Sequence, residues 1–203
     1  MKNIVCHGLG ETPKQWESVL RQIPTKVECP ELFNFVQEKV FTYQKLYKAF
    51  ERYCDSESEL LNLCGLSLGG VLALNYASCH SEKVRSLVLI GTPYKIPRLA
   101  FAFQDVLFHL MPQKTFLSMG LTKSNAIHLM RSMLGLDIPH MASLVMCKTL
   151  IICGEKDKTN IQSADSMHHV IKQSQFKMIK GAGHQVNVEK TIELSKLIET
   201  FWK

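Results

Sequence analysis

The chain has 203 residues, of which 46% are hydrophobic and 21% are charged, and its formal net charge is +6. This length suits one domain with a sizeable core, and the composition is that of an ordinary soluble globular protein. The densest basic stretch, residues 39–52, interleaves its charges with apolar residues at helical spacing. That pattern indicates a solvated helix face, so we expect no nucleic-acid-binding surface.

The cysteines and the apolar runs bear on where the protein resides. The seven cysteines include no C-x-x-C pair, and Cys6, Cys64 and Cys153 lie in strand-like apolar runs. Buried thiols behave as small hydrophobes, so we expect a reduced, cytoplasmic chain without disulfides. The chain opens on a strand-like run rather than a secretory signal, and residues 99–111, its longest apolar stretch, are too short to span a bilayer. We therefore expect no stable membrane insertion.

The first third of the chain alternates strand-length apolar runs with helical patterns. Residues 4–6 form a short run that ends at His7. A helix is then predicted from Thr12 as N-cap, with Pro at its first position and Gln15 in the capping-box position. Residues 27–29 predict a short strand, and apolar residues at helical spacing predict a helix over 35–53.

The rest of the chain continues this alternation with one interruption. Strands are predicted at 60–64, 84–90, 150–153 and 176–179, and helices after Ser67 and over 161–172 and 188–202. Strands that alternate with helices predict an α/β domain over residues 1–203, with a parallel sheet covered on both faces. Residues 94–146 are helical and rich in Met and Phe, and we interpret them as an inserted helical cap.

Ser67 stands in the stretch Gly-Leu-Ser67-Leu-Gly-Gly, between a predicted strand and a predicted helix. A G-x-S-x-G pattern is weak evidence by itself, because Ser67 could be only a small residue of the turn. A sharp turn here would lift the hydroxyl above the carboxyl edge of the sheet, beside the amides of the helix N-terminus.

Three other strand ends carry polar motifs. His-Gly-Leu9-Gly follows the first strand, Gly-Glu155-Lys-Asp157 follows the strand at 150–153, and Gly-Ala-Gly-His184 follows the last strand. The carboxyl ends of parallel strands meet at one edge of the sheet. That edge would therefore hold a hydroxyl, a general base and a carboxylate, which are the three requirements of an activated serine.

In this order, the motifs HGLG, GLSLGG, GEKD and GAGH resemble those of the α/β-hydrolase superfamily, over nearly the whole chain. The resemblance is to small bacterial-type serine hydrolases or esterases with a short cap. It implies a three-layer α/β/α fold. Two strands that usually precede the HG strand are missing here, so we expect a reduced, mostly parallel sheet of about six strands.

The resemblance also implies roles for five residues. Ser67 would attack an acyl carbonyl, His184 would carry its proton, and Asp157 would orient His184. The backbone N–H groups of Leu9 and Leu68 would form the oxyanion hole. No cofactor and no metal are implied.

Several simpler interpretations stay open. The sole role of Asp157 could be to cap the next helix, since Asp favours such positions. Glu155 is the nearest rival carboxylate, but it lies closer to the strand end and has less reach. His168 and His169 are expected on a helix surface. The histidines and cysteines lack metal-ligand spacing, and neither a Rossmann fingerprint nor a P-loop is present.

The predicted cap bears on the substrate. Its Met and Phe side chains must partly pack on the domain, yet near Ser67 they favour a small molecule with an apolar acyl or alkyl group. Arg98, Lys114 and Lys123 could meet a carboxylate. The leading hypothesis is a carboxylesterase-like serine hydrolase. The alternatives are thioester, C–C bond, peptide or lyase chemistry with the same triad, or a non-catalytic ligand-binding protein. The sequence does not indicate an oligomeric state.

Overall fold

One six-stranded sheet organises the structure, a computed structural model that describes residues 1–36, 40–96 and 98–203. The side chains of residues 98–101, 103 and 104 also lie outside this description. The strand order is β2-β1-β3-β4-β5-β6, and all neighbouring strands are parallel. The strands are β1 (Lys2–Cys6), β2 (Val27–Glu28), β3 (Leu61–Leu66), β4 (Val84–Ile90), β5 (Lys148–Gly154) and β6 (Ser174–Ile179). The predicted α/β class and sheet of about six strands are confirmed.

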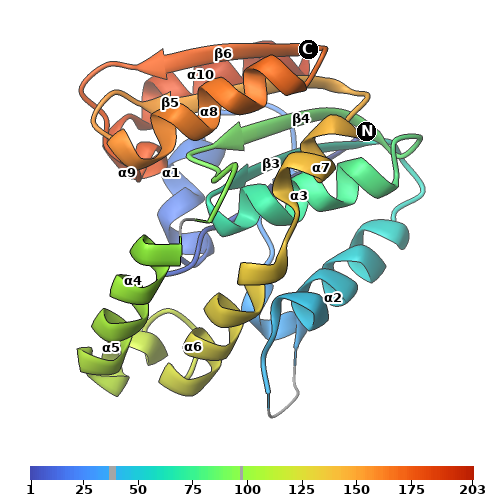
Figure 1. Cartoon of the computed structure of the whole chain (residues 1–203). Helices are drawn as coiled ribbons and strands as arrows, with labels where there is room; N and C mark the ends of the chain where they lie inside the picture. Colours follow the sequence, from blue (N-terminus) through green and yellow to red (C-terminus); the bar gives the residue numbers. More distant parts are fainter. Residues whose placement is uncertain (37–39, 97) are drawn as a thin grey trace.

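Helices cover both faces of the sheet (Figure 1). On one face lie α1 (Glu17–Leu20), α9 (Val186–Glu189) and α10 (Thr191–Trp202). On the other face lie α2 (Tyr43–Asp55), α3 (Leu68–Cys79), α7 (Ile138–Ser143) and α8 (Lys158–Val170). The predicted three-layer arrangement is therefore confirmed.

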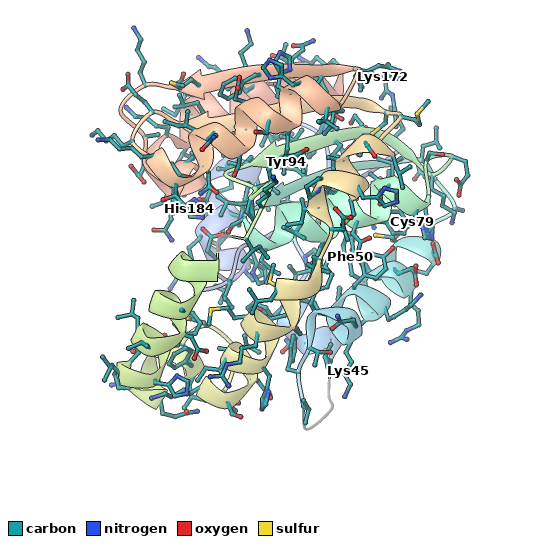
Figure 2. The ribbon with its side chains drawn as sticks, in the orientation of Figure 1. Lys45, Phe50, Cys79, Tyr94, Lys172 and His184 are labelled. Atoms are coloured by element: carbon teal, nitrogen blue, oxygen red, sulfur yellow. The ribbon has the colours of Figure 1, made fainter. Side chains whose placement is uncertain are left out.

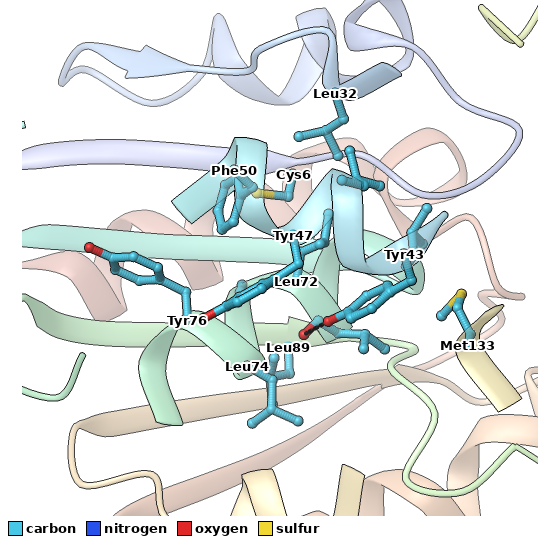
Figure 3. Close-up of a cluster of buried hydrophobic side chains, with 14 of the residues drawn as sticks. Cys6, Leu32, Tyr43, Tyr47, Phe50, Leu72, Leu74, Tyr76, Leu89 and Met133 are labelled. Carbon is cyan, nitrogen blue, oxygen red and sulfur yellow. Dashed lines mark hydrogen bonds between the residues drawn. The ribbon is translucent and has the colours of Figure 1, made fainter. Parts of the chain in front are cut away.

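Alternate residues of each strand build two separate cores, because successive side chains point to opposite faces. In β4, Leu87 and Leu89 join the core under α2 and α3, whereas Val88 and Ile90 join the core under α1 and α10. Figure 3 shows the first core, where aromatic side chains of α2 such as Phe50 lie beside residues of α3.

A buried polar ladder crosses three strands near their amino ends. Ser86 Oγ donates to Asn62 Oδ1 over 2.6 Å, and Asn62 Nδ2 donates to Asn3 Oδ1 over 2.8 Å. These bonds satisfy side chains that water cannot reach. They lie at the end of the sheet opposite to the predicted functional residues.

The structure corrects three predicted helices. The helix predicted over 35–53 begins only at Tyr43, the first residue of α2. Phe35 is instead the last residue of a 3₁₀ helix (Leu32–Phe35), and Thr42 caps α2 by accepting from the Lys45 N–H. Residues 37–39 of that prediction lie outside the described part. The helix predicted over 161–172 is α8, which begins at residue 158 and ends at 170.

The helix predicted over 188–202 is two helices, because Lys190 (φ −137°, ψ 48°) interrupts α9 and α10. After Thr12, a 3₁₀ helix (Pro13–Trp16) precedes α1. There the predicted capping position is confirmed, because Gln15 Oε1 accepts from the Thr12 N–H over 2.9 Å.

The segment 94–146 contains α4 (Arg98–Leu110), α5 (Gln113–Leu117), α6 (Lys123–Ser132), a 3₁₀ helix (Met133–Gly135) and α7. Figure 1 shows α4, α5 and α6 set apart from the sheet, whereas α7 packs against α3 and α8. An ion pair ties α6 to α4, from Arg131 to Asp105. The division into a domain and a cap stays a prediction. Among the described residues, no helix is long and apolar enough to cross a membrane.

Candidate active site

Ser67 occupies a strained turn between β3 and α3. Its backbone has φ 53° and ψ −113°, and no other non-glycine residue in the described part has a positive φ. The Ser67 N–H donates to the Ile90 carbonyl at the end of β4 over 2.9 Å. A side chain at such a φ is held only where the surroundings enforce it, and this strain often marks functional sites.

The glycines around Ser67 let the backbones approach closely. A Cβ at Gly69 would overlap the carbonyl of Cys6, the last residue of β1. A Cβ at Gly65 would overlap the backbone of Gly69. The pattern in the sequence therefore has a steric cause: α3 lies tightly on β1 and β3, and the turn presents Ser67 at the carboxyl edge.

His184 and Asp157 form a hydrogen-bonded pair at the same edge. Asp157 follows β5 and His184 follows β6, and His184 Nδ1 donates to Asp157 Oδ2 over 2.6 Å. The Asp157 side chain is only 6% exposed, and the His184 side chain is 41% exposed. Burial raises the pKa of Asp157, but hydrogen bonds from His184 and Asn160 outweigh it and hold this pKa below the ordinary value. Donation through Nδ1 leaves Nε2 of the neutral ring as an acceptor.

Asp157 stands at the N-cap of α8, yet its carboxylate caps nothing. Instead, both carboxylate oxygens accept from Asn160 Nδ2, over 3.0 and 2.9 Å. The rival Glu155 is engaged elsewhere, because its Oε2 accepts from the Gly181 N–H over 2.8 Å. The geometry thus pairs His184 with Asp157 rather than with Glu155.

Gly91, which directly follows β4, lies against this pair. A Cβ here would stand 3.0 Å from His184 Cε1 and Nδ1 and 3.2 Å from Asp157 Oδ2, and its φ is +51°. Sequence reasoning missed this residue and also Asn160. The sequence did contain a signal for each: Gly91 directly follows the predicted strand at 84–90, and Asn160 carries an amide about one helical turn after Asp157.

The Leu9 and Leu68 N–H groups have the freedom that an oxyanion hole needs. Leu68 is the first residue of α3, where backbone N–H groups lack helical partners. The carbonyl of Gly8 accepts from the Glu11 N–H and lies 3.0 Å from His7 Nδ1. Because a trans peptide directs its N–H opposite to its C=O, the Leu9 N–H points away from this buried side.

A cleft of about 750 Å³ joins Ser67 and Leu9 to the segment 94–146. One wall is apolar and is formed by Leu107, Phe108, Met111, Met119, Met130 and Met133. A second part of the lining is an uncharged polar side of α8, formed by Thr159, Asn160, Gln162, Ser163 and Ser166. Figure 2 places Tyr94, which also lines the cleft, near the same end of the sheet as His184.

Two of the charged candidates of the segment 94–146 do not contribute to this lining. Lys114 and Lys123 are not among the residues that line the cleft, and the Arg98 side chain lies outside the described part. Lys95 is the charged residue that the described lining contains. His168 and His169 are exposed on α8, as predicted.

The predicted residues are brought together only in part. No hydrogen bond joins Ser67 Oγ to His184 or to any other residue of the described part. Catalytic hydrogen bonds are often loose in unliganded enzymes and tighten with substrate. The structure therefore contains a bonded His184–Asp157 pair and, separate from it, Ser67 in the lining of the cleft.

Known proteins resemble this chain in sequence and structure. No protein-family model matches it. It is 25% identical, over 98% of its length and 89% of the other protein, to a putative 2-succinyl-6-hydroxy-2,4-cyclohexadiene-1-carboxylate synthase of Bacillus subtilis (strain 168).

Among solved structures, MenH from S. aureus superposes with a TM-score of 0.82 at 18% identity, covering 98% of this chain and 92% of that one. The enol-lactonase of Burkholderia xenovorans LB400 superposes with a TM-score of 0.86 at 16% identity, covering 99% and 91%. A thermophilic esterase from Thermogutta terrifontis gives 0.82 at 17% identity, covering 100% and 89%. Together with the parallel sheet, these likenesses show that the chain has the α/β-hydrolase fold, as the sequence motifs implied.

Proposed function

We propose that the protein is a carboxylesterase-like serine hydrolase that cleaves small esters through Ser67, His184 and Asp157. The observation that carries this proposal is the bonded His184–Asp157 pair at the sheet edge where strain presents Ser67. A buried carboxylate that fixes one imidazole nitrogen and leaves the other free is the arrangement that a general base needs.

In the proposed reaction, Ser67 Oγ attacks the acyl carbonyl while His184 Nε2 takes its proton. Asp157 stabilises the imidazolium, and the N–H groups of Leu9 and Leu68 donate to the oxyanion. The intermediate collapses to an acyl-Ser67, and the imidazolium gives its proton to the leaving alkoxide. Water, deprotonated by His184, then attacks the acyl group to form a second tetrahedral intermediate. As this intermediate releases the carboxylic acid, the imidazolium returns its proton to Ser67 Oγ.

The lining of the cleft supports the substrate class. The methionines give a deformable apolar surface suited to a short or medium acyl or alkyl chain. The face of α8 offers hydroxyl and amide groups without charge. We propose an ester of a small molecule with an apolar acyl or alkyl chain. We also propose that the protein works in the reducing cytoplasm, which suits its seven free cysteines.

A lyase is the second candidate, because the Bacillus subtilis relative is named a synthase and not a hydrolase. Acyl transfer predicts a covalent acyl-Ser67, whereas lyase chemistry does not. The esterase and the enol-lactonase among the structural neighbours support acyl chemistry as the first candidate.

The decisive experiment compares p-nitrophenyl acetate and butyrate turnover by wild type and Ser67→Ala. We expect the variant to lose at least about 10³-fold in kcat, because its nucleophile is gone. The exposed Ser143→Ala on α7 is the matched control and should keep full activity. Fluorophosphonate should label wild type at Ser67 and leave Ser67→Ala unlabelled. Equal rates in wild type and Ser67→Ala would remove Ser67 from the mechanism. A folded wild type that is neither active nor labelled would favour the lyase or a ligand-binding role.

A further inference from the structure

Glu11 is a buried carboxylate that the proposed reaction does not use. It is 2% exposed and follows directly on the His-Gly-Leu-Gly turn after β1. Burying a carboxylate is costly unless charges or hydrogen bonds compensate it. In the described part of the chain, its side-chain partners are three neutral N–H groups. Such a residue needs an explanation beyond packing.

The three bonds connect two loops that are far apart in sequence. Glu11 Oε2 accepts from the Gly8 N–H over 3.0 Å and from Trp16 Nε1 over 3.3 Å. Glu11 Oε1 accepts from Asn187 Nδ2 over 3.0 Å. Asn187 is fully buried in α9, three residues after His184. The carboxylate therefore bridges the turn that carries Leu9 and the segment that carries His184.

The same carboxylate fixes the peptide that presents the Leu9 N–H. Gly8 is held at its N–H by Glu11 Oε2 and at its carbonyl by the Glu11 N–H, over 3.3 Å. The turn is thus closed on both sides by one residue. Because the Leu9 N–H points opposite to the Gly8 carbonyl, the angle of this donor depends on the Glu11 bonds.

We propose that Glu11 is a positioning residue. It sets the direction of the Leu9 N–H, and through Asn187 it ties the turn that carries Leu9 to the segment that carries His184. This inference rests on the proposed function, since it assigns Glu11 a role in the same reaction. All three bonds need an acceptor at position 11, so a leucine, which has a similar size and no acceptor, removes them all. Glutamine is the conservative variant, because its oxygen can accept from Gly8 and Trp16. Its NH₂ can donate to Asn187 Oδ1, which is buried and has no hydrogen-bond partner in the described structure, once the Asn187 amide turns over.

The test first removes the acceptors and then rebuilds the bridge with the two side chains exchanged. Glu11→Leu should lower kcat for p-nitrophenyl butyrate by about 10- to 100-fold, somewhat less than the ~10²–10³ of a lost oxyanion donor, with KM within about twofold. Glu11→Gln, which keeps an acceptor for Gly8 and Trp16, should stay within about threefold of wild type. Asn187→Asp alone should also lower kcat, because it places two carboxylates face to face. In Glu11→Gln/Asn187→Asp, the glutamine oxygen can accept from Gly8 and Trp16 while its NH₂ donates to the new aspartate. We expect kcat to return to within about threefold of wild type.

Controls separate positioning from stability. Ser86→Ala breaks the buried polar ladder at the opposite end of the sheet and should lower the thermal midpoint without lowering kcat. All assays run well below the measured midpoints. Amide hydrogen exchange at Gly8 should be slow in wild type and faster in Glu11→Leu.

Two results would overturn the role of Glu11: full kcat in a folded Glu11→Leu, or a Glu11→Gln/Asn187→Asp variant no better than Asn187→Asp alone. If Glu11→Leu does not fold, the double variant alone decides, since its activity depends on the restored bridge. An inactive, unlabelled wild type would instead contradict the proposed function. In that case Gly8 exchange still reports whether Glu11 holds the turn, and unchanged exchange in Glu11→Leu would overturn the inference.

Discussion

Asn160 donates from one amide nitrogen to both carboxylate oxygens of Asp157, over 3.0 Å to Oδ1 and 2.9 Å to Oδ2. Asn160 lies in the first turn of α8 and is itself buried. The amide therefore holds the plane of the carboxylate that receives His184. It also helps to keep the pKa of Asp157 low, against the effect of burial, which raises it.

Asn160→Ala should lower kcat for p-nitrophenyl butyrate about 10-fold, because the Asp157 carboxylate gains freedom to turn away from His184. This decrease corresponds to a loss of about 1.4 kcal/mol in transition-state stabilisation. The exposed Lys158→Ala, in the same turn of α8, is the control and should keep its activity. Steady-state kinetics measure both variants. An unchanged kcat in Asn160→Ala would mean that His184 alone fixes Asp157.

Gly91→Ala should damage the site by steric contact. The new methyl group would meet the His184 ring at 3.0 Å, closer than ordinary van der Waals contact, and the φ of +51° disfavours any side chain by about 1–2 kcal/mol. We expect a loss of at least about 10-fold in kcat and a lower thermal midpoint. Gly135→Ala is the matched control, since its Cβ would meet nothing within 4 Å. Equal kcat in the two variants would show that the pair tolerates displacement.

The fold, and the placement of Ser67, Asp157 and His184 at one edge of the sheet, could be predicted because their signals are local. Ser67, Asp157 and His184 each follow a strand, and parallel strands bring their carboxyl ends to one edge. The roles of Glu11 and Asn187 could not be predicted in this way. They arise from a contact between residues 176 positions apart, which no local pattern encodes.

The errors in the helix boundaries have a similar cause. Val36 and Val40 continue the helical spacing of α2 in the sequence, yet Val36 has an extended backbone and Val40 is exposed. The cap residue Thr42 was the competing local signal, since a threonine before a helix supplies an oxygen for the first free N–H groups. Here the cap determined where the helix begins, and hydrophobic spacing did not.

The methionines that line the cleft should control the length of the acyl chain that the protein accepts. Met119 lines the cleft beside the turn that carries Leu9, with its Sδ 3.8 Å from where a Cβ of Gly10 would stand. Met119→Ala should open this end of the cleft and raise the kcat/KM ratio of octanoate to butyrate esters about 5- to 10-fold, since one or two methylenes are worth about 1–3 kcal/mol in such pockets. The exposed Met178→Ala on β6 is the control and should leave the ratio unchanged. A constant ratio in Met119→Ala would place the acyl chain elsewhere in the cleft.

Glu28 should make stability depend on pH in the acid range. A hydrogen bond from Lys2 lowers the pKa of Glu28 to about 2, with a further contribution from the Tyr53 hydroxyl and against the effect of burial. The unfolded chain should have a pKa near ~4.3 at this residue. The folded state therefore binds the proton less tightly, so the stabilisation is complete above pH ~4.3 and declines as pH falls toward about 2.

Urea unfolding of wild type and Glu28→Gln between pH 7 and pH 3 measures this effect. The difference in unfolding free energy should be constant from pH 7 to about 5.5 and should shrink steadily below about 4.5, since protonated Glu28 resembles glutamine in charge. Glu17→Gln removes the exposed pair with Arg21 and should change the unfolding free energy little, because such pairs contribute about 0–1 kcal/mol. A Glu28→Gln difference that stays the same down to pH 3 would mean that packing, and not the charge of Glu28, stabilises this edge of the sheet.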